Sequence, residues 1–214
     1  MPVTGTSSGI GRAVTEVLLE KGEIVVATAR RPNTLDDLVQ KYSTDRLLPL
    51  QLDITQSEEI EAAFLRTMEA FGRIDVVLNN AGCASLGEVE ALDESQGRAV
   101  METNFWGTLR VSKEAVRFFR ESNPSGLGGR LLQMSSYLGL TAGPGVGYYA
   151  ASKFGEFPNE VVRPCSHPLS PLSTRRSHGE LGRRVGSRLE YQSLHCPYVV
   201  SFHVPHASFL DNPH

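Results

Sequence analysis

Hydrophobic positions along the first 155 residues follow two alternating periods. Short apolar runs, typical of buried strands, are each followed by a segment whose apolar residues recur every three or four positions, which is typical of an amphipathic helix. The predicted strands are residues 23–28, 47–53, 74–78 and 129–134, and the predicted later helices are residues 33–42, 57–71, 96–119 and 148–156. Strands that alternate with helices predict right-handed βαβ units, and hence a doubly wound α/β domain with a parallel sheet.

The first helix is predicted to begin near Gly11 and to end at Gly22. Four apolar residues at helical spacing are expected on its buried face: Ala13, Val14, Val17 and Leu18. Only Met1-Pro2-Val3 precedes the turn that leads into this helix, which is too little for a full strand. We therefore expect a sheet that is incomplete at both ends of the chain, with a central strand that is cut short.

The residue composition changes abruptly near residue 155. All six histidines lie beyond it, and Lys153 is the last lysine. We therefore expect two parts, a domain over residues 1–155 and an atypical, largely irregular tail over residues 156–214. The change at a single point also raises the hypothesis that the tail comes from a shifted reading frame or an unspliced intron.

Two features of the tail have a structural interpretation. Pro158 interrupts the last predicted helix, because a proline in a helix interior costs about 3 kcal/mol. Residues 196–204 are the one strand-like run. Histidine and cysteine side chains of the tail could instead bind a metal ion, but their spacing fits no zinc pattern, so we expect no metal. These candidate ligands are His195, Cys196, His203 and His206.

Composition and charge exclude several classes of protein. Apolar residues make up 40% of the chain and charged residues 21%, which is typical of a soluble globular protein. The net charge of −3 argues against binding to nucleic acid, which usually requires a basic excess. No apolar run approaches the ~18 residues of a membrane span and no signal peptide is visible, so we expect no membrane partner. Three cysteines cannot pair completely, which favours a reducing, cytoplasmic location.

A glycine-rich turn, Gly5-x-x-x-Gly9-x-Gly11, joins the short first strand to the first helix. Glycine tolerates a positive φ and lets a pyrophosphate approach the backbone, and the N-terminus of a helix offers free N–H groups and a positive dipole end. Ser7 and Ser8 can add hydroxyl contacts. The pattern predicts a dinucleotide-binding turn, and the alternative is a glycine-rich turn that binds no ligand.

Tyr149 and Lys153 stand four residues apart in the last predicted helix, so their side chains share one face. A nearby positive charge favours the phenolate form of a tyrosine, which makes the phenol a usable acid–base group. Ser136 follows an apolar strand, and ligands of parallel sheets bind at the carboxyl ends of strands. Asn104 lies inside the long predicted helix, although asparagine is a mediocre helix former. The alternatives are a mere surface contact for Tyr149 and Lys153, and for Asn104 a helical asparagine that is solvated or hydrogen-bonded to its own backbone.

These motifs, together with Asp53 and the run Asn80-Ala81-Gly82, resemble the short-chain dehydrogenase/reductase family in their order and spacing over residues 3–155. The resemblance implies a Rossmann fold and an oxidoreductase that transfers a hydride between nicotinamide and a carbonyl or secondary alcohol. The chain is most similar to the NADPH-type members with a broad carbonyl or steroid-like substrate range.

The resemblance also implies a role for each candidate residue. Tyr149 would exchange a proton with the substrate oxygen, which Ser136 would hold. Lys153 would hydrogen-bond the nicotinamide ribose and favour the phenolate of Tyr149. Asn104 would support a water that links Lys153 to solvent, and Asp53 would contact the adenine. The implied coenzyme-binding residues are Gly5, Ser7, Ser8, Gly9, Ile10, Gly11, Arg30, Asp53, Asn80, Ala81, Gly82, Tyr149 and Lys153.

The end of the second predicted strand bears on the choice of coenzyme. In NAD-type members of the family, an acidic residue at this point binds the ribose hydroxyls. This chain has no acid there, and Arg30 and Arg31 follow the strand directly. A 2′-phosphate favours a cation, and the planar fork of arginine suits it, so the sequence predicts NADP(H) over NAD(H). The alternative is that both arginines are solvated loop charges.

Three functions remain open from the sequence. The leading one is an NADP(H)-dependent oxidoreductase whose partner is a small carbonyl or alcohol substrate. The second is an inactive or truncated nucleotide-binding remnant, because residues 156–214 lack the family's usual substrate-binding part. The third is an epimerase or dehydratase, for which the tail is too short. Family members often pair through the long helix and the helix of Tyr149, so the resemblance implies a possible homo-oligomer.

Overall fold

The computed structural model describes residues 1–124, 127–156 and 199–202. The strands are β1 (Pro2–Thr4), β2 (Val25–Ala29), β3 (Leu47–Gln51), β4 (Val76–Asn79), β5 (Arg130–Met134) and β6 (Val199–Phe202). The α-helices are α1 (Gly9–Glu20), α2 (Asp36–Lys41), α3 (Ser57–Phe71), α4 (Glu94–Met101), α5 (Thr108–Glu121) and α6 (Gly147–Glu156). Short 3₁₀ turns are η1 (Pro32–Leu35), η2 (Val89–Ala91) and η4 (Tyr137–Gly139), and η3 (Glu102–Gly107) is π-helical.

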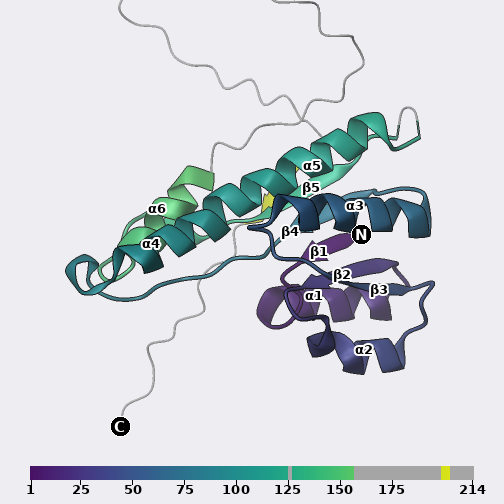
Figure 1. Cartoon of the computed structure of the whole chain (residues 1–214), viewed down its shortest axis with the longest axis horizontal. Coiled ribbons are helices and arrows are strands. Elements are labelled where there is room, and N and C mark those ends of the chain that lie inside the picture. Colours follow the sequence, from purple (N-terminus) through teal and green to yellow (C-terminus); the bar gives the residue numbers. More distant parts are fainter. Residues whose placement is uncertain (125–126, 157–198, 203–214) are drawn as a thin grey trace, which may run out of the picture.

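All six strands are parallel and form one sheet in the order β3-β2-β1-β4-β5-β6. Helices α1 and α2 cover one face of the sheet, and α3 and α5 cover the other (Figure 1). The strand order reverses its direction of growth between β1 and β4, where ligands of doubly wound sheets bind. The predicted doubly wound parallel sheet is therefore confirmed.

Each face of the sheet has its own hydrophobic core, because successive side chains of a strand point to opposite faces. Val77 belongs to the core under α3 and α5, and its neighbour Leu78 belongs to the core under α1 and α2. In the first core, the rings of Phe64 and Phe118 lie 5.3 Å apart between centroids and join α3 to α5. These two cores hold the strand ends, and hence the residues that follow them, in fixed positions.

The central strand β1 has only three residues, all of them buried. It pairs with residues 26–28 of β2 on one side, and Val3 pairs with Leu78 of β4 on the other. Three residues suffice because both neighbouring strands supply partners. The expectation of a short central strand is confirmed.

The prediction for the buried face of the first helix is wrong in part. The buried residues of α1 are Gly11, Thr15 and Leu19, with Val14 and Leu18 partly buried. Ala13 is exposed, and 48% of Val17 is exposed. Thr15 takes a buried position because its hydroxyl donates to the carbonyl oxygen of Gly11 at 2.8 Å. A search for apolar spacing cannot detect a buried residue of this kind.

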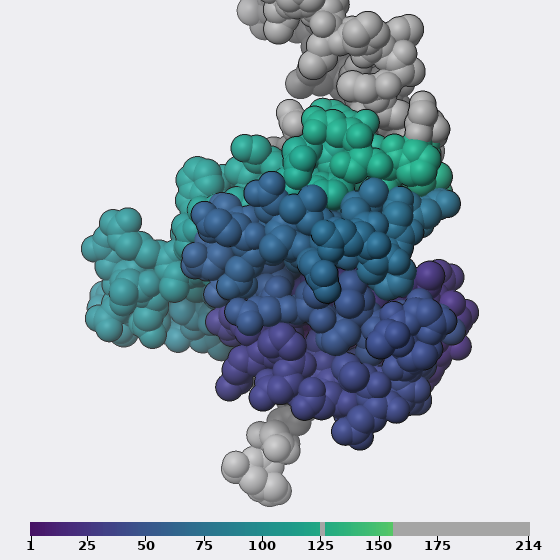
Figure 2. Space-filling model, turned by 45° about the vertical axis from the view of Figure 1, so that its right-hand side comes forward, coloured from purple at the N-terminus to yellow at the C-terminus, as the bar shows by residue number. Residues whose placement is uncertain are grey.

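The long helix predicted over residues 96–119 is longer than expected and not uniform. It begins at Glu94, where Asp93 and Gln96 form a capping box, and continues through η3 and α5. The π-helical middle was not predicted. The end of this helix formed by α4, with the loop before it, stands out as a teal lobe beyond the purple and blue bulk of the molecule (Figure 2). The predicted helix 33–42 is divided into η1 and α2, and most other boundaries move by one or two residues.

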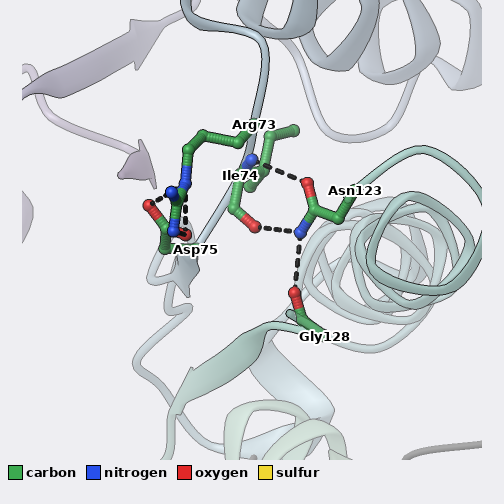
Figure 3. A network of polar contacts seen from close by, with 5 residues as sticks. All are labelled: Arg73, Ile74, Asp75, Asn123 and Gly128. Carbon is green, nitrogen blue, oxygen red and sulfur yellow. Dashed lines mark hydrogen bonds and ion pairs between the residues drawn. The ribbon is translucent and has the colours of Figure 1, made fainter. Parts of the chain in front are cut away.

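A buried asparagine fixes the far end of α5 to the sheet (Figure 3). The side-chain oxygen of Asn123 accepts from the N–H of Ile74 at 2.9 Å, and Nδ2 donates to the carbonyl oxygens of Ile74 and Gly128 at 2.6 and 2.7 Å. Next to it, the guanidinium of Arg73 binds both carboxylate oxygens of Asp75. Asn123 therefore sets the position of α5 relative to the segments that enter β4 and β5.

Little of the predicted tail can be compared with the structure. Within residues 196–204, Val199–Phe202 form β6 and pair in parallel with β5. Pro158 and the candidate metal ligands of the tail lie outside the described residues. Among the residues that are described, no group of three or more metal-ligating side chains is present. In the same residues, no helix is both long enough and apolar enough to cross a membrane.

Candidate active site

The residues singled out in the sequence gather along one edge of the sheet, because the carboxyl ends of parallel strands meet there. The edge is formed by Gly5 after β1, Arg30 after β2, Asp53 after β3, Asn80, Ala81 and Gly82 after β4, and Ser136 after β5. Residues that are more than a hundred positions apart in sequence thus lie at one edge of the sheet.

The three glycines of the turn after β1 differ in what a side chain at each position would meet. Gly5 and Gly9 have φ angles of +71° and +58°, a region that side chains disfavour. A Cβ atom on Gly11 would lie 2.3 Å from the carbonyl oxygen of Gly5 and 2.5 Å from Nδ2 of Asn80. A Cβ atom on Gly9 would meet nothing within 4 Å. Gly11 is therefore needed for internal packing, whereas Gly9 faces open space.

The run after β4 is held against this glycine turn by hydrogen bonds. Oγ1 of Thr4 accepts from the N–H groups of Asn80 and Ala81, both at 2.9 Å. In return, Nδ2 of Asn80 donates to the carbonyl oxygens of Thr4 and Gly5 at 2.9 and 3.3 Å. The structure thus gives Asn80 a direct role in shaping the glycine turn.

The N-terminus of α1 lies open at this edge. Ser8 is the N-cap residue, and its side chain makes no capping hydrogen bond. Ser7, Ser8, Gly9 and Ile10 are all exposed. The first N–H groups of this 12-residue helix are therefore not covered by a capping side chain, and the positive end of the helix dipole lies open at this edge.

The end of β2 is tied to the glycine turn and carries two cations. The N–H and hydroxyl of Thr6 both donate to the carbonyl oxygen of Thr28, at 3.0 and 3.1 Å. Arg30 and Arg31 are exposed, and their side chains form no hydrogen bond or ion pair with the described residues. Their charges are therefore uncompensated in that part of the chain.

Asp53 lies after β3 and is partly buried. Its Oδ1 accepts from the N–H and the hydroxyl of Thr55, at 2.9 and 2.8 Å, and its own N–H donates to Glu59 at 2.6 Å. This local turn fixes the carboxylate, while Oδ2 accepts no hydrogen bond from the described residues. The geometry leaves one oxygen available to a ligand.

The end of β5, which leads to Ser136, lies against α6, which carries Tyr149 and Lys153. Nζ of Lys153 lies 6.0 Å from the centroid of the Tyr149 ring and donates to the carbonyl oxygen of Met134, the last residue of β5, at 3.1 Å. The Lys153 side chain is almost fully buried. Oγ of Ser136 accepts from the N–H of Leu138 at 3.2 Å, and its own hydroxyl proton has no acceptor among the described residues. The hydroxyl can therefore donate to a substrate oxygen.

Asn104 is fully buried within the π-helical segment η3. Its Oδ1 accepts from the N–H of Cys83 at 2.9 Å, and its Nδ2 donates to the carbonyl oxygen of Cys83 and to Oγ of Ser152, at 2.8 and 2.9 Å. Both amide hydrogens are thus used by protein acceptors. The expected support of a water by Asn104 would therefore use the second lone pair of Oδ1 or the backbone carbonyl oxygen of Asn104.

Sequence reasoning missed two residues that organise this site. Ser152, immediately before Lys153, is completely buried and donates to the carbonyl oxygen of Tyr149 at 2.7 Å while accepting from Asn104. Ser152 stands three residues after Tyr149, on the same helix face, and this spacing could have indicated that it lies at the site. Cys83 contributes only backbone atoms to Asn104, so its side-chain type gave no signal.

Comparisons with known proteins all lead to one family of enzymes. The family described as short chain dehydrogenase matches residues 1–157. The oxidoreductase BOA17 of Botryotinia fuckeliana is 38% identical over 152 residues, which cover 71% of this chain and 54% of that protein. The structure of a short-chain dehydrogenase from Streptomyces avermitilis has 36% identity and a TM-score of 0.66, covering 72% of this chain and 55% of that one.

A third comparison involves a bound coenzyme analogue. An alcohol dehydrogenase from the archaeon Thermococcus sibiricus, solved with 5-hydroxy-NADP, has 26% identity and a TM-score of 0.65, covering 72% of this chain and 65% of that one. The chain spans about half the length of the curated relatives it matches. Since the family match extends over most of the chain and includes every candidate site residue, the chain belongs to the short chain dehydrogenase family.

Proposed function

We propose that this chain binds NADP(H) and serves hydride transfer between nicotinamide and a carbonyl or secondary alcohol. The observation that carries the proposal is that Lys153, which lies beside the Tyr149 ring, donates to Met134, two residues before Ser136, at the strand edge that also holds the glycine turn. Acid–base chemistry and dinucleotide binding are thereby adjacent, as a hydride-transfer enzyme requires.

The described residues fit the coenzyme. The uncapped N-terminus of α1 and the open space at Gly9 suit a pyrophosphate, and the available oxygen of Asp53 suits the adenine amino group. Oγ of Ser135, at the end of β5, is buried without a hydrogen-bond partner in the described residues, which a polar ligand would supply. When bound, the nicotinamide ring supplies or accepts the hydride.

The chain's own residues would handle the substrate oxygen and its proton. The hydroxyl of Ser136, already oriented by the N–H of Leu138, donates a hydrogen bond to that oxygen. The phenol of Tyr149 gives a proton to the oxygen during reduction and takes it back during oxidation. The buried ammonium of Lys153 lies beside the Tyr149 ring and would hydrogen-bond the nicotinamide ribose.

Arg30 and Arg31 support the preference for NADP(H) over NAD(H). Both side chains are exposed at the end of β2 and have no carboxylate partner among the described residues. A 2′-phosphate there would gain charge-assisted hydrogen bonds, whereas the ribose hydroxyls of NAD(H) would gain much less.

A second candidate function is nucleotide binding without turnover. It is favoured by the length of the chain, which spans about half of its curated relatives. The same coenzyme contacts serve both functions, so binding alone does not separate them.

The separating experiment follows NADPH consumption by the purified 214-residue chain against a panel of aliphatic, aromatic and polycyclic ketones. The proposal predicts turnover of at least one ketone, faster with NADPH than with NADH. Coenzyme binding without turnover of any ketone or of the matching alcohols would support the second function instead.

Location and assembly remain predictions from the sequence. The cysteine content favours the cytoplasm, and the family resemblance favours a homo-oligomer. Size-exclusion chromatography with light scattering and imaging of a tagged chain would test them.

A further inference from the structure

Arg12 connects the helix of the glycine turn to the segment that follows the end of β2. From the first turn of α1, its Nε pairs with Glu16 at 2.7 Å, its Nη1 donates to the carbonyl oxygen of Thr34 at 3.3 Å, and its Nη2 pairs with Asp37. Thr34 belongs to η1 and Asp37 to α2. One guanidinium therefore bridges three elements, and only 19% of its side chain is exposed.

Thr34 passes this connection on to the arginine pair. Its N–H and its hydroxyl both donate to the carbonyl oxygen of Arg31, at 3.1 and 2.8 Å. Arg31 is also the N-cap residue of η1. The backbone that carries Arg30 and Arg31 is thus held to α1 through Thr34 and the guanidinium of Arg12.

At its other end, Arg12 is part of the glycine turn itself. It follows Gly11, which packs against Gly5, and its N–H donates to the carbonyl oxygen of Ser8 at 3.3 Å. The side chain therefore joins the position expected for the pyrophosphate to the position expected for the 2′-phosphate.

The charges around Arg12 indicate that it positions other residues and does not bind the coenzyme. It faces two carboxylates, Glu16 and Asp37, so its positive charge is already compensated. The hydrogen bond from Arg12 lowers the pKa of Asp37, which keeps that carboxylate ionised and bound to the guanidinium. Arg30 and Arg31 have no such partner among the described residues.

We propose that Arg12 is a positioning residue for coenzyme choice. Its side chain holds Arg30 and Arg31 at the distance from the glycine turn that the binding of NADP(H) requires. This inference rests on the proposed binding of NADP(H). It predicts that loss of Arg12 weakens the binding of NADPH much more than the binding of NADH. A purely structural tie between helices would weaken both equally, through the stability of the fold.

The experiment measures dissociation constants of NADPH and NADH by titration calorimetry for the full chain and four variants. Arg12→Ala removes the bridge, and Arg12→Lys keeps the charge but loses the fork. Arg12→Asp combined with Asp37→Arg exchanges the pair and tests rescue. Arg66→Ala is the control, because Arg66 forms an exposed pair with Glu69 on α3, away from this edge.

Arg12→Ala and Arg12→Lys are expected to lower the affinity for NADPH about tenfold, which is the loss expected from one misplaced charge-assisted hydrogen bond. Both variants should change the affinity for NADH by less than about twofold. The exchanged pair should recover part of the NADPH affinity, and Arg66→Ala should match wild type. If Arg12→Ala fails to fold, Arg12→Lys and the exchanged pair decide the outcome.

The possible failures are distinguishable. A wild-type chain that binds both coenzymes equally contradicts the proposed choice of NADP(H), and the role of Arg12 with it. The second failure concerns Arg12 alone. Its proposed role is overturned if the wild type prefers NADPH but the Arg12 variants keep the full preference, or lose affinity for both coenzymes equally.

Discussion

The side-chain amide of Asn104 donates a hydrogen bond of 2.9 Å to the hydroxyl of Ser152, across 48 positions of sequence. Asn104 lies in a π-helical turn, and Ser152 lies on α6 next to Lys153. The bond fixes α6, which carries Tyr149 and Lys153, to the long helix. Asn104 and Ser152 therefore set the position of Tyr149 and Lys153 relative to the long helix.

Replacing Ser152 with alanine should destabilise the fold. The change leaves an amide hydrogen of Asn104 buried without an acceptor, which costs about 1–3 kcal/mol. Chemical denaturation measures the free energy of unfolding. Ser95→Ala is the control, because Ser95 is an exposed serine of α4. Equal stability of the two variants would mean that the Asn104–Ser152 bond does not hold α6.

Replacing Asn123 with alanine should destabilise the fold by about 3 kcal/mol, since three backbone groups of Ile74 and Gly128 lose a buried partner. Hydrogen exchange at the start of β4 and β5 should accelerate as well. Asn33→Ala, at an exposed asparagine of η1, serves as the control. A change below about 1 kcal/mol would indicate that water replaces these contacts without loss.

Replacing Gly11 with alanine should disrupt the glycine turn. The added methyl group would lie 2.3 Å from the carbonyl oxygen of Gly5, so the turn or α1 must move, at a cost of about 3 kcal/mol. Gly72→Ala is the control, because Gly72 has φ +69° but open space around it, and it should cost only about 1–2 kcal/mol of backbone strain. Thermal melts with and without NADPH separate the two effects, since only Gly11→Ala should also lose coenzyme binding.

Replacing Tyr149 with phenylalanine should lower kcat about 10²- to 10⁴-fold, because the proposed proton donor is lost while the ring remains. The stability of the chain should stay unchanged, since no hydrogen bond of the Tyr149 hydroxyl holds the described fold. Tyr148→Phe is the matched control: the Tyr148 ring packs on Gly97 and takes no part in the proposed chemistry. Equal loss of turnover in both variants would contradict the role of Tyr149.

The contact between Arg12 and Asp37 should depend on pH. Its hydrogen bond lowers the pKa of Asp37 in the folded chain, so the contact stabilises the fold at every pH above the ordinary aspartate pKa of about 3.9. That stabilisation is lost as the pH falls through the lowered pKa. The difference in unfolding free energy between wild type and Asp37→Asn should therefore be constant above about pH 5 and shrink below about pH 4. A difference that stays constant to about pH 2 would contradict the assignment.

The sequence predicts the alternation of strands and helices because each period of two or of three to four reflects which side chains the sheet buries. It predicts the turn at Gly5, Gly9 and Gly11 because few other residues satisfy its φ angles and close contacts. In the same way, the spacing of Tyr149 and Lys153 is enough to place both on one helix face.

Other features depend on contacts that a local pattern does not contain. The π-helical turn at Asn104 takes up only the six residues Glu102–Gly107 between two α-helices, so the apolar pattern predicts one uniform helix. The contact of Arg12 with Asp37 joins residues 25 positions apart, and each looks like a surface charge by itself. Thr15 is buried through a hydrogen bond to its own helix, which an apolar pattern misses.

A thermal melt of the 214-residue chain, alone and with saturating NADPH or NADH, tests most directly whether these residues form an NADP(H) site. A ligand present at 100 times its dissociation constant adds about 2.7 kcal/mol to the stability of the folded chain. The account predicts a cooperative transition whose Tm rises with NADPH and rises less with NADH at the same concentration. A transition that neither coenzyme shifts, or that NADH shifts more than NADPH, would contradict it.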